Sequence, residues 1–252
     1  MRIFLLANNR VGLQIAEFLK KDKEDIVALA VHNPDKQRYT QEIIHACKIK
    51  KNNIFFAKEL RNPQVIKKIK KIEPDIIIAA FWGYILKPEI IQLPLKGCIN
   101  FHPGYLPYNR GMNPNVWPIV EGTPAGVTLH YIDDGIDTGD IVSRKKVKVE
   151  PFDTAETLYD KTLIEIVDLF KKTWPVIKHG KVKRISQKML KKSTFHWAKD
   201  ISLLDRIDLD KTYSGRELIN ILRARSYSDR YYAYFEEEGK KIYVRLQLSE
   251  KI

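Results

Sequence analysis

The chain has 252 residues, 44% of them hydrophobic, a formal net charge of +13 and a pI near 9.5. This length suits one large domain, or one domain with a small second one. No apolar run is long enough for a signal peptide or a membrane span, so we expect a cytoplasmic protein without a membrane partner. The basic residues are scattered rather than interleaved with aromatic ones, which argues against a nucleic-acid partner.

The first hundred residues alternate short apolar runs with amphipathic stretches. The pattern predicts strands at 3–7, 26–31, 54–57, 75–80 and 98–101, and helices at 11–20, 37–48 and 63–71. This rhythm predicts an α/β fold of Rossmann-like type, with a parallel sheet covered by helices on both faces. In such sheets ligands bind beyond the carboxyl ends of the strands.

The pattern changes in the second half of the chain. We expect strands at 126–131 and 141–149, a helix at 154–178 capped by Asp153 or Thr154, and a helix at 214–224. Alternating residues at 231–235 and 241–248, with Gly239 between them, predict a β-hairpin. We place a domain boundary near residue 182. Residues 1–182 then form the catalytic domain, and 183–252 form a small helix-plus-hairpin subdomain for substrate binding or oligomerisation.

Cysteines, histidines and glycines exclude several common sites. Cys47 and Cys98 lie far apart without CxxC spacing, which favours buried thiols in a reducing compartment. Only Gly12 follows the first strand, so the dinucleotide fingerprint is incomplete, and neither a Walker A loop nor HExxH occurs. Five histidines without metal-ligand spacing are interpreted as surface or core residues, with His130 in a strand as structural: His32, His45, His130, His179 and His196.

Polar residues gather at two backbone bends. Asn100 and His102 end the strand at 98–101, and Asp137 lies in the Asp-Gly-rich loop 133–140. Acyl transfer to an amine uses this combination, because the oxyanion needs hydrogen-bond donors and the amine needs a base with a charged partner. The alternative is a pair of ordinary turns. A calcium loop is excluded because no glutamate stands at its twelfth position.

Two segments resemble the signatures of the folate-dependent formyltransferases. They are NFHPGYLPYNRG at 100–111, followed by Pro114 and Trp117, and GVTLH at 126–130 followed by DTGDI at 137–141. The resemblance implies direct formyl transfer from N10-formyltetrahydrofolate as co-substrate, with no metal. It also implies that Asn100, His102 and Asp137 are the catalytic residues.

The resemblance further implies a co-substrate site. Members of the family hold the pterin between the loop after the fourth strand and the aspartate loop. The residues expected to bind it are Trp82, Tyr84, Leu86, Ile132, Asp133 and Asp134. An apolar slot with a few polar groups suits a flat heteroaromatic ring.

The tail favours one class of amine acceptor. ILRARSY at 221–227, AYF at 233–235 and GKKIYV at 239–244 resemble the C-terminal segment of nucleotide-sugar N-formyltransferases. This implies a nucleotide-linked amino-dideoxy sugar, best dTDP-4-amino-4,6-dideoxyglucose, in surface-polysaccharide (O-antigen, lipopolysaccharide) synthesis. The tail hairpin offers an edge that could pair in a homodimer. The expected substrate contacts are Tyr105, Arg110, Asn113, Arg223 and Tyr227.

Other activities remain open at this point. A methionyl-tRNA formyltransferase-like enzyme fits the positive charge, but residues 181–252 are short for the barrel domain of that class. A GDP-perosamine N-formyltransferase is a second alternative. A glycinamide ribonucleotide enzyme is disfavoured because Asn8, Asn9 and Arg10 replace its glycine-serine phosphate loop. An inactive folate- or nucleotide-binding regulator is the non-enzyme alternative.

Overall fold

The computed structural model describes residues 1–250. Seven strands form one sheet in the order β3-β2-β1-β4-β5-β7-β8, and two small sheets pair β6 with β9 and β10 with β11. The first five strands of the large sheet pair in parallel. They are β1 (Arg2–Ala7), β2 (Asp25–Val31), β3 (Ile54–Phe56), β4 (Ile76–Ala80) and β5 (Cys98–His102).

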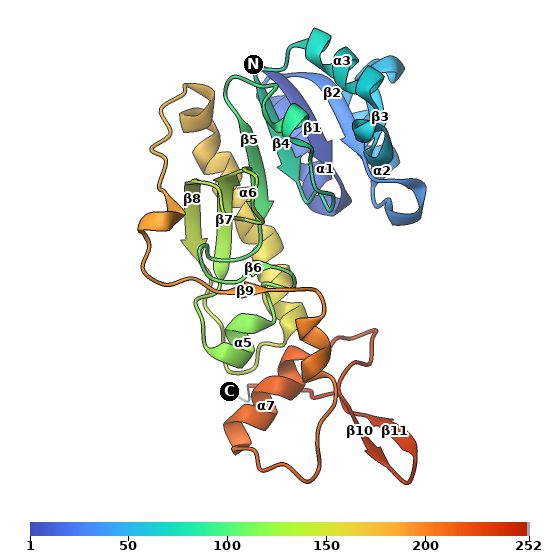
Figure 1. The fold of residues 1–252 in the computed structure, drawn as a ribbon, viewed down its shortest axis with the longest axis vertical. Helices are drawn as coiled ribbons and strands as arrows, with labels where there is room; N and C mark the ends of the chain where they lie inside the picture. The colour runs from blue at the N-terminus through green and yellow to red at the C-terminus, as the bar shows by residue number, and fades with distance from the viewer. Residues whose placement is uncertain (251–252) are drawn as a thin grey trace. The chain divides into compact units, whose positions relative to one another are not determined.

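The remaining strands and the helices follow in chain order (Figure 1). The strands are β6 (Arg110–Gly111), β7 (Gly126–Tyr131), β8 (Ile141–Lys146), β9 (Phe195–His196), β10 (Tyr234–Glu237) and β11 (Lys240–Tyr243). The α-helices are α1 (Asn9–Lys21), α2 (Thr40–Cys47), α3 (Pro63–Ile72), α4 (Pro88–Ile91), α5 (Trp117–Glu121), α6 (Ala155–Lys178) and α7 (Gly215–Ala224). Short 3₁₀ turns lie at Pro34–Lys36, Lys51–Asn53, Ala57–Arg61, Gln187–Met189 and Asp200–Leu204.

The expected Rossmann-like sheet and C-terminal hairpin are confirmed, with changes at the ends of some elements. The helix expected from residue 37 begins at Thr40, because Tyr39 has a left-handed φ of 58°. The strand expected to reach residue 149 ends at Lys146. Its apolar alternation continues because Val147 and Val149 pack in an apolar cluster outside the sheet.

The hairpin is shifted relative to its expected position. Glu237 pairs with Lys240, so the turn holds only Glu238 and Gly239, at φ 48° and 71°. Positive φ at both central residues is the pattern of a type I′ two-residue hairpin turn. The acidic residues before the turn therefore belong to β10, where they lie opposite lysines of β11.

The residues divide into two compact units. The first comprises residues 1–102, 129–143 and 166–187, and the second comprises 103–128, 144–165 and the chain from 188 on. In the first unit β1 is buried on both faces, as an interior parallel strand should be. Its Phe4 and Leu6 pack in a cluster with Ile69 of α3 and Ile77 of β4.

The second unit has its own apolar cluster. Val116, Ile119 and Ala224 are fully buried there, and helices α5 and α7 pack together. Strands β6 and β9 pair in parallel. The indole of Trp117 stacks on the His196 ring, with centroids 3.8 Å apart.

Two further expectations can be compared with the described residues. Cys47 and Cys98 are both buried free thiols, as predicted. Among residues 1–250 no helix has the length and apolar character needed to cross a membrane.

Candidate active site

The structure brings together the three residues expected to be catalytic, all within the first unit. Asn100 and His102 lie on β5, and Asp137 lies in the loop between β7 and β8. Asp137 Oδ2 is 3.4 Å from His102 Nδ1, and Asp137 Oδ1 is 3.5 Å from Asn100 Nδ2. One carboxylate therefore faces both the imidazole and the amide. His102 is only 4% exposed, so this charge interaction is poorly screened by water.

This arrangement defines what the imidazole can do. With Nδ1 directed at the carboxylate, a hydrogen on Nδ1 can be donated to Asp137, and Nε2 is the nitrogen on the far side of the ring. A neighbouring carboxylate favours the protonated imidazolium. The Asn100 amide adds a second hydrogen-bond donor beside it. The amide and the imidazolium can donate hydrogen bonds to a tetrahedral oxyanion, and the imidazole can transfer a proton.

His130 joins this cluster, which the sequence interpretation as a structural strand residue did not anticipate. Its Nε2 is 3.1 Å from Asn100 Nδ2 and 3.3 Å from Asp137 Oδ1. Its Nδ1 is 2.8 Å from the carbonyl oxygen of Tyr131. A carbonyl can only accept, so Nδ1 carries a hydrogen. Nε2 of His130 thus lies beside both the amide of Asn100 and the carboxylate of Asp137.

The loop that carries Asp137 is held by contacts that the sequence did not reveal. Asp137 has a left-handed φ of 54°. The side-chain amide of Gln187 donates to the carbonyls of Asp137 and Gly139, at 2.9 and 2.7 Å. A Cβ at Gly139 would lie 2.0 Å from the carbonyl oxygen of Tyr131, so only glycine fits this close approach. These contacts fix the backbone on both sides of the carboxylate.

Three residues expected to bind the co-substrate line one pocket of about 230 Å³ in the first unit: Trp82, Tyr84 and Leu86. Ala57, Leu60 and Ile90 supply further apolar lining, and Lys58, Arg61 and Lys87 supply positive charge. Among residues 1–250 no carboxylate forms an ion pair with these three cations. The pocket therefore suits a ring-bearing anion.

The other residues expected at the co-substrate lie outside this pocket lining. Ile132 packs against the same apolar cluster as Trp82. Asp133 accepts hydrogen bonds within its own loop, from Gly135 N at 3.1 Å and Thr138 Oγ1 at 2.6 Å. Asp134 is exposed. Asp133 is thus a loop-shaping residue in the structure.

The residues expected to contact substrate all lie in the second unit. The guanidinium of Arg144 lies over the ring of Tyr105, with its Cζ 4.4 Å from the ring centroid. Arg110 donates to Ser193 Oγ at 3.4 Å. Asn113 has a φ of 57°, and its carbonyl accepts from Val116 N at 2.9 Å.

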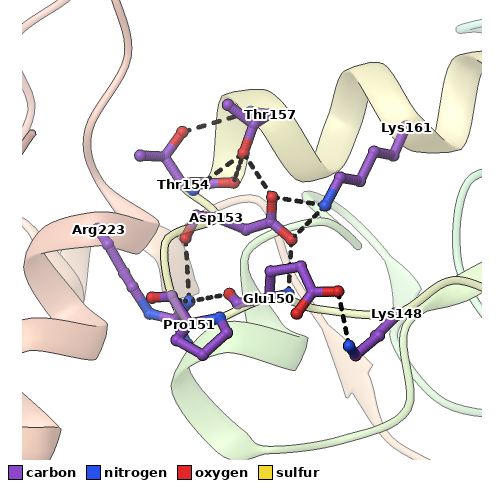
Figure 2. Close-up of polar contacts among 8 residues, drawn as sticks. All are labelled: Lys148, Glu150, Pro151, Asp153, Thr154, Thr157, Lys161 and Arg223. Atoms are coloured by element: carbon purple, nitrogen blue, oxygen red, sulfur yellow. Dashed lines mark hydrogen bonds and ion pairs between the residues drawn. The ribbon is translucent and has the colours of Figure 1, made fainter. Parts of the chain in front are cut away.

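Arg223 and Tyr227 make contacts that organise the protein itself. Figure 2 shows Arg223 of α7 reaching the segment before α6, where its Nη1 donates to the carbonyls of Glu150, Pro151 and Asp153. The Asp153 carboxylate faces Lys161, at 2.7 Å. The Tyr227 hydroxyl accepts from Asn115 Nδ2 at 3.1 Å, and burial raises the pKa of Tyr227.

The described residues offer no ready-made metal site. Within residues 1–250 no group of three or more His, Cys, Asp or Glu side chains is arranged to hold a metal ion. The polar groups at the end of β5 can act on a carbonyl through hydrogen bonds and proton transfer.

The parallel sheet and the Asn-His-Asp cluster at a strand end define an α/β group-transfer enzyme. The chain belongs to the formyl transferase family, whose model matches residues 1–192, and it is an N-formyltransferase. A second model, the N-formyltransferase dimerization C-terminal domain, matches residues 200–250.

Relatives of known name include enzymes with different acceptors. A methionyl-tRNA formyltransferase of Clostridioides difficile is 29% identical over an alignment of 259 positions, and this alignment covers 100% of this chain and 82% of that protein. A 4-N formyltransferase from Francisella tularensis is 28% identical, with a TM-score of 0.82 over 99% of this chain and 98% of that one. The formyltransferase PseJ from Anoxybacillus kamchatkensis is 29% identical, with a TM-score of 0.59. The match covers 89% of this chain and 98% of the PseJ chain. PseJ was solved with UDP-4,6-dideoxy-4-formamido-L-AltNAc and tetrahydrofolate.

Proposed function

We propose that the chain transfers a formyl group from N10-formyltetrahydrofolate to the amine of a nucleotide-linked amino-dideoxy sugar. The observation that carries the formyl-transfer chemistry is the Asp137 carboxylate facing both His102 Nδ1 and Asn100 Nδ2. The folate is a co-substrate, consumed in each turnover. Trp82, Tyr84 and Leu86 supply the apolar pocket for it, and PseJ binds tetrahydrofolate.

The proposed reaction is a direct transfer. The neutral amine nitrogen attacks the formyl carbon, and the oxyanion accepts hydrogen bonds from Asn100 and from protonated His102. Protonated His102 gives its proton to N10 as the carbon–N10 bond breaks, and then takes the proton that the amine loses, with Asp137 holding its charge. The products are a formamido sugar and tetrahydrofolate.

A sugar amine is the acceptor that the similarities favour. The 4-N formyltransferase from Francisella tularensis is similar to this chain, with a TM-score of 0.82 over 99% of this chain's residues. The complex of PseJ contains a 4-formamido sugar nucleotide. We propose dTDP-4-amino-4,6-dideoxyglucose as the substrate, used in surface-polysaccharide synthesis in the cytoplasm. Tyr105, Arg110 and Asn113 remain our proposed sugar or phosphate contacts.

A tRNA acceptor is the second candidate. It is supported by the methionyl-tRNA formyltransferase of Clostridioides difficile and by the net charge of +13. The sugar acceptor ranks higher because residues 200–250 match the N-formyltransferase dimerization C-terminal domain and the complex of PseJ contains a 4-formamido sugar nucleotide.

We also propose that the protein is a homodimer and that the boundary between its two domains lies near residue 182. The family model matched at residues 200–250 describes a dimerization domain, which supports self-association through the tail.

A panel of acceptors tests the proposed function. Purified protein is incubated with N10-formyltetrahydrofolate and dTDP-, GDP- or UDP-linked 3-amino and 4-amino sugars, with initiator methionyl-tRNA as the competing acceptor. Mass spectrometry should find a formamido sugar, most rapidly from the dTDP-4-amino sugar. Formylation of the tRNA with none of any amino sugar would overturn the ranking.

A further inference from the structure

The loop after β4 carries much of the co-substrate pocket yet has no helix or strand of its own. It includes Trp82, Tyr84 and Leu86, all of which line the pocket. Phe81 starts the loop with a left-handed φ of 58°. A loop of this kind needs contacts from elsewhere to keep one shape.

His32, directly after β2, supplies those contacts. His32 is 7% exposed, and its ring meets Trp82 and Tyr84 edge-on, with centroids 5.1 and 4.8 Å away. Its Nε2 accepts a hydrogen bond from the backbone N–H of Gly83 at 3.2 Å. One imidazole thus touches three successive residues of the pocket wall.

The next residue reinforces this attachment. The backbone N–H of Asn33 is 3.4 Å from the Tyr84 hydroxyl, and Asn33 Oδ1 accepts from Lys58 N at 3.1 Å. A Cβ at Gly83 would lie 3.3 Å from His32 Cε1, so the missing side chain permits the close approach. The end of β2 therefore joins two sides of the pocket, at Tyr84 and at Lys58.

The hydrogen bond to Gly83 fixes the protonation state of His32. A backbone N–H can only donate, so Nε2 must carry no hydrogen and the ring must be neutral. The charged and titratable groups around it are Asp35, Lys36 and Tyr84. Burial, the largest influence, lowers the pKa of His32; a hydrogen bond to the Lys36 backbone and the charge of Asp35 oppose this, and the charge of Lys36 adds to it.

We propose that His32 is a positioning residue that shapes the Trp82–Leu86 wall of the co-substrate pocket, and that its protonation releases this wall. The folate part of this inference rests on the proposed function. Protonated His32 would place an N–H against the N–H of Gly83. Two donors repel, so the loop must move and the pocket loses the shape that holds a flat ring. Binding of the co-substrate then weakens as the pH falls.

Three variants separate the roles of the ring and of its acceptor nitrogen. His32→Gln keeps an acceptor at the position of Nε2 but does not titrate, whereas His32→Phe keeps a ring without an acceptor. His179→Gln is the control, because His179 is exposed. The probe is 5-formyltetrahydrofolate, and its Kd is measured by calorimetry between about pH 4 and pH 8, because burial moves the protonation of His32 below the ordinary pKa of histidine.

The expected result is a selective effect on folate binding. In the wild type and in His179→Gln, the Kd rises about tenfold toward low pH, the size expected for one lost buried hydrogen bond. His32→Gln should lose this pH dependence, and His32→Phe should bind weakly at every pH. The KM for N10-formyltetrahydrofolate should follow the Kd, while kcat at saturation changes little.

Tryptophan fluorescence without ligand separates this inference from the proposed function. The wild type should show a pH transition that both Trp82→Phe and His32→Gln abolish. That transition without any folate binding would contradict the proposed function and leave the positioning role standing. Tight, pH-independent folate binding by His32→Phe would overturn the positioning role.

Discussion

Replacing Arg223 by methionine separates a structural role from substrate binding. Arg223 is 9% exposed, and its Nη1 lies 2.9, 3.2 and 3.0 Å from the carbonyls of Glu150, Pro151 and Asp153. Nε donates to Asn220 Oδ1 at 2.9 Å. Nη1 has two hydrogens, so these contacts amount to two full bonds plus the one from Nε. At about 1 kcal/mol each, Arg223→Met should lower the free energy of unfolding by about 3 kcal/mol.

Urea unfolding followed by circular dichroism measures this loss. Methionine keeps most of the buried length of the side chain, so the loss reports the hydrogen bonds. Arg216→Met is the matched control on the same helix, and it should change stability by less than about 0.5 kcal/mol because Arg216 is exposed. An unchanged urea midpoint for Arg223→Met, with a raised KM for the sugar nucleotide, would refute the structural role and favour substrate contact.

Two further predictions concern the catalytic loop and the cysteines. Gly139→Ala would place its Cβ against the Tyr131 carbonyl, so it should displace the loop and reduce kcat at least about tenfold, whereas Gly215→Ala, with nothing near its Cβ, should keep normal kcat. Equal kcat in both variants would contradict this reasoning. Burial raises the pKa of Cys47 and of Cys98 to about 12, so iodoacetamide at pH 8 should label neither thiol until urea unfolds the protein. Rapid labelling of the folded protein would contradict it.

Local patterns in the sequence predicted the architecture well. The unbroken apolar run in β4 and the alternation of strands and helices depend only on neighbouring residues, and the structure confirms the parallel sheet they indicate. Errors occurred where distant packing decides the end of an element. Val147 and Val149 keep a strand-like pattern because both pack, partly buried, against an apolar cluster, although β8 has already ended.

The cluster of Asn100, His102 and Asp137 was only partly predictable, for a similar reason. Asn100, His102 and Asp137 stand in recognisable segments, but the contact of His130 with Asn100 joins residues 30 positions apart. His130 belongs to the GVTLH segment, and its position on the strand that leads into the aspartate loop was the available signal. No local sequence pattern indicated the hydrogen bond from Gln187 to that loop, because Gln187 lies 50 residues from Asp137 in the chain.

The turnover of His102→Ala tests the central claim most directly. Formation of the formamido sugar is measured with N10-formyltetrahydrofolate and the best amino-sugar acceptor, for wild type and variant, with circular dichroism to show that both are folded. We predict that His102→Ala loses kcat by at least about a hundredfold, because both the oxyanion donor and the proton shuttle are removed. A folded His102→Ala enzyme with near-wild-type kcat would contradict the account.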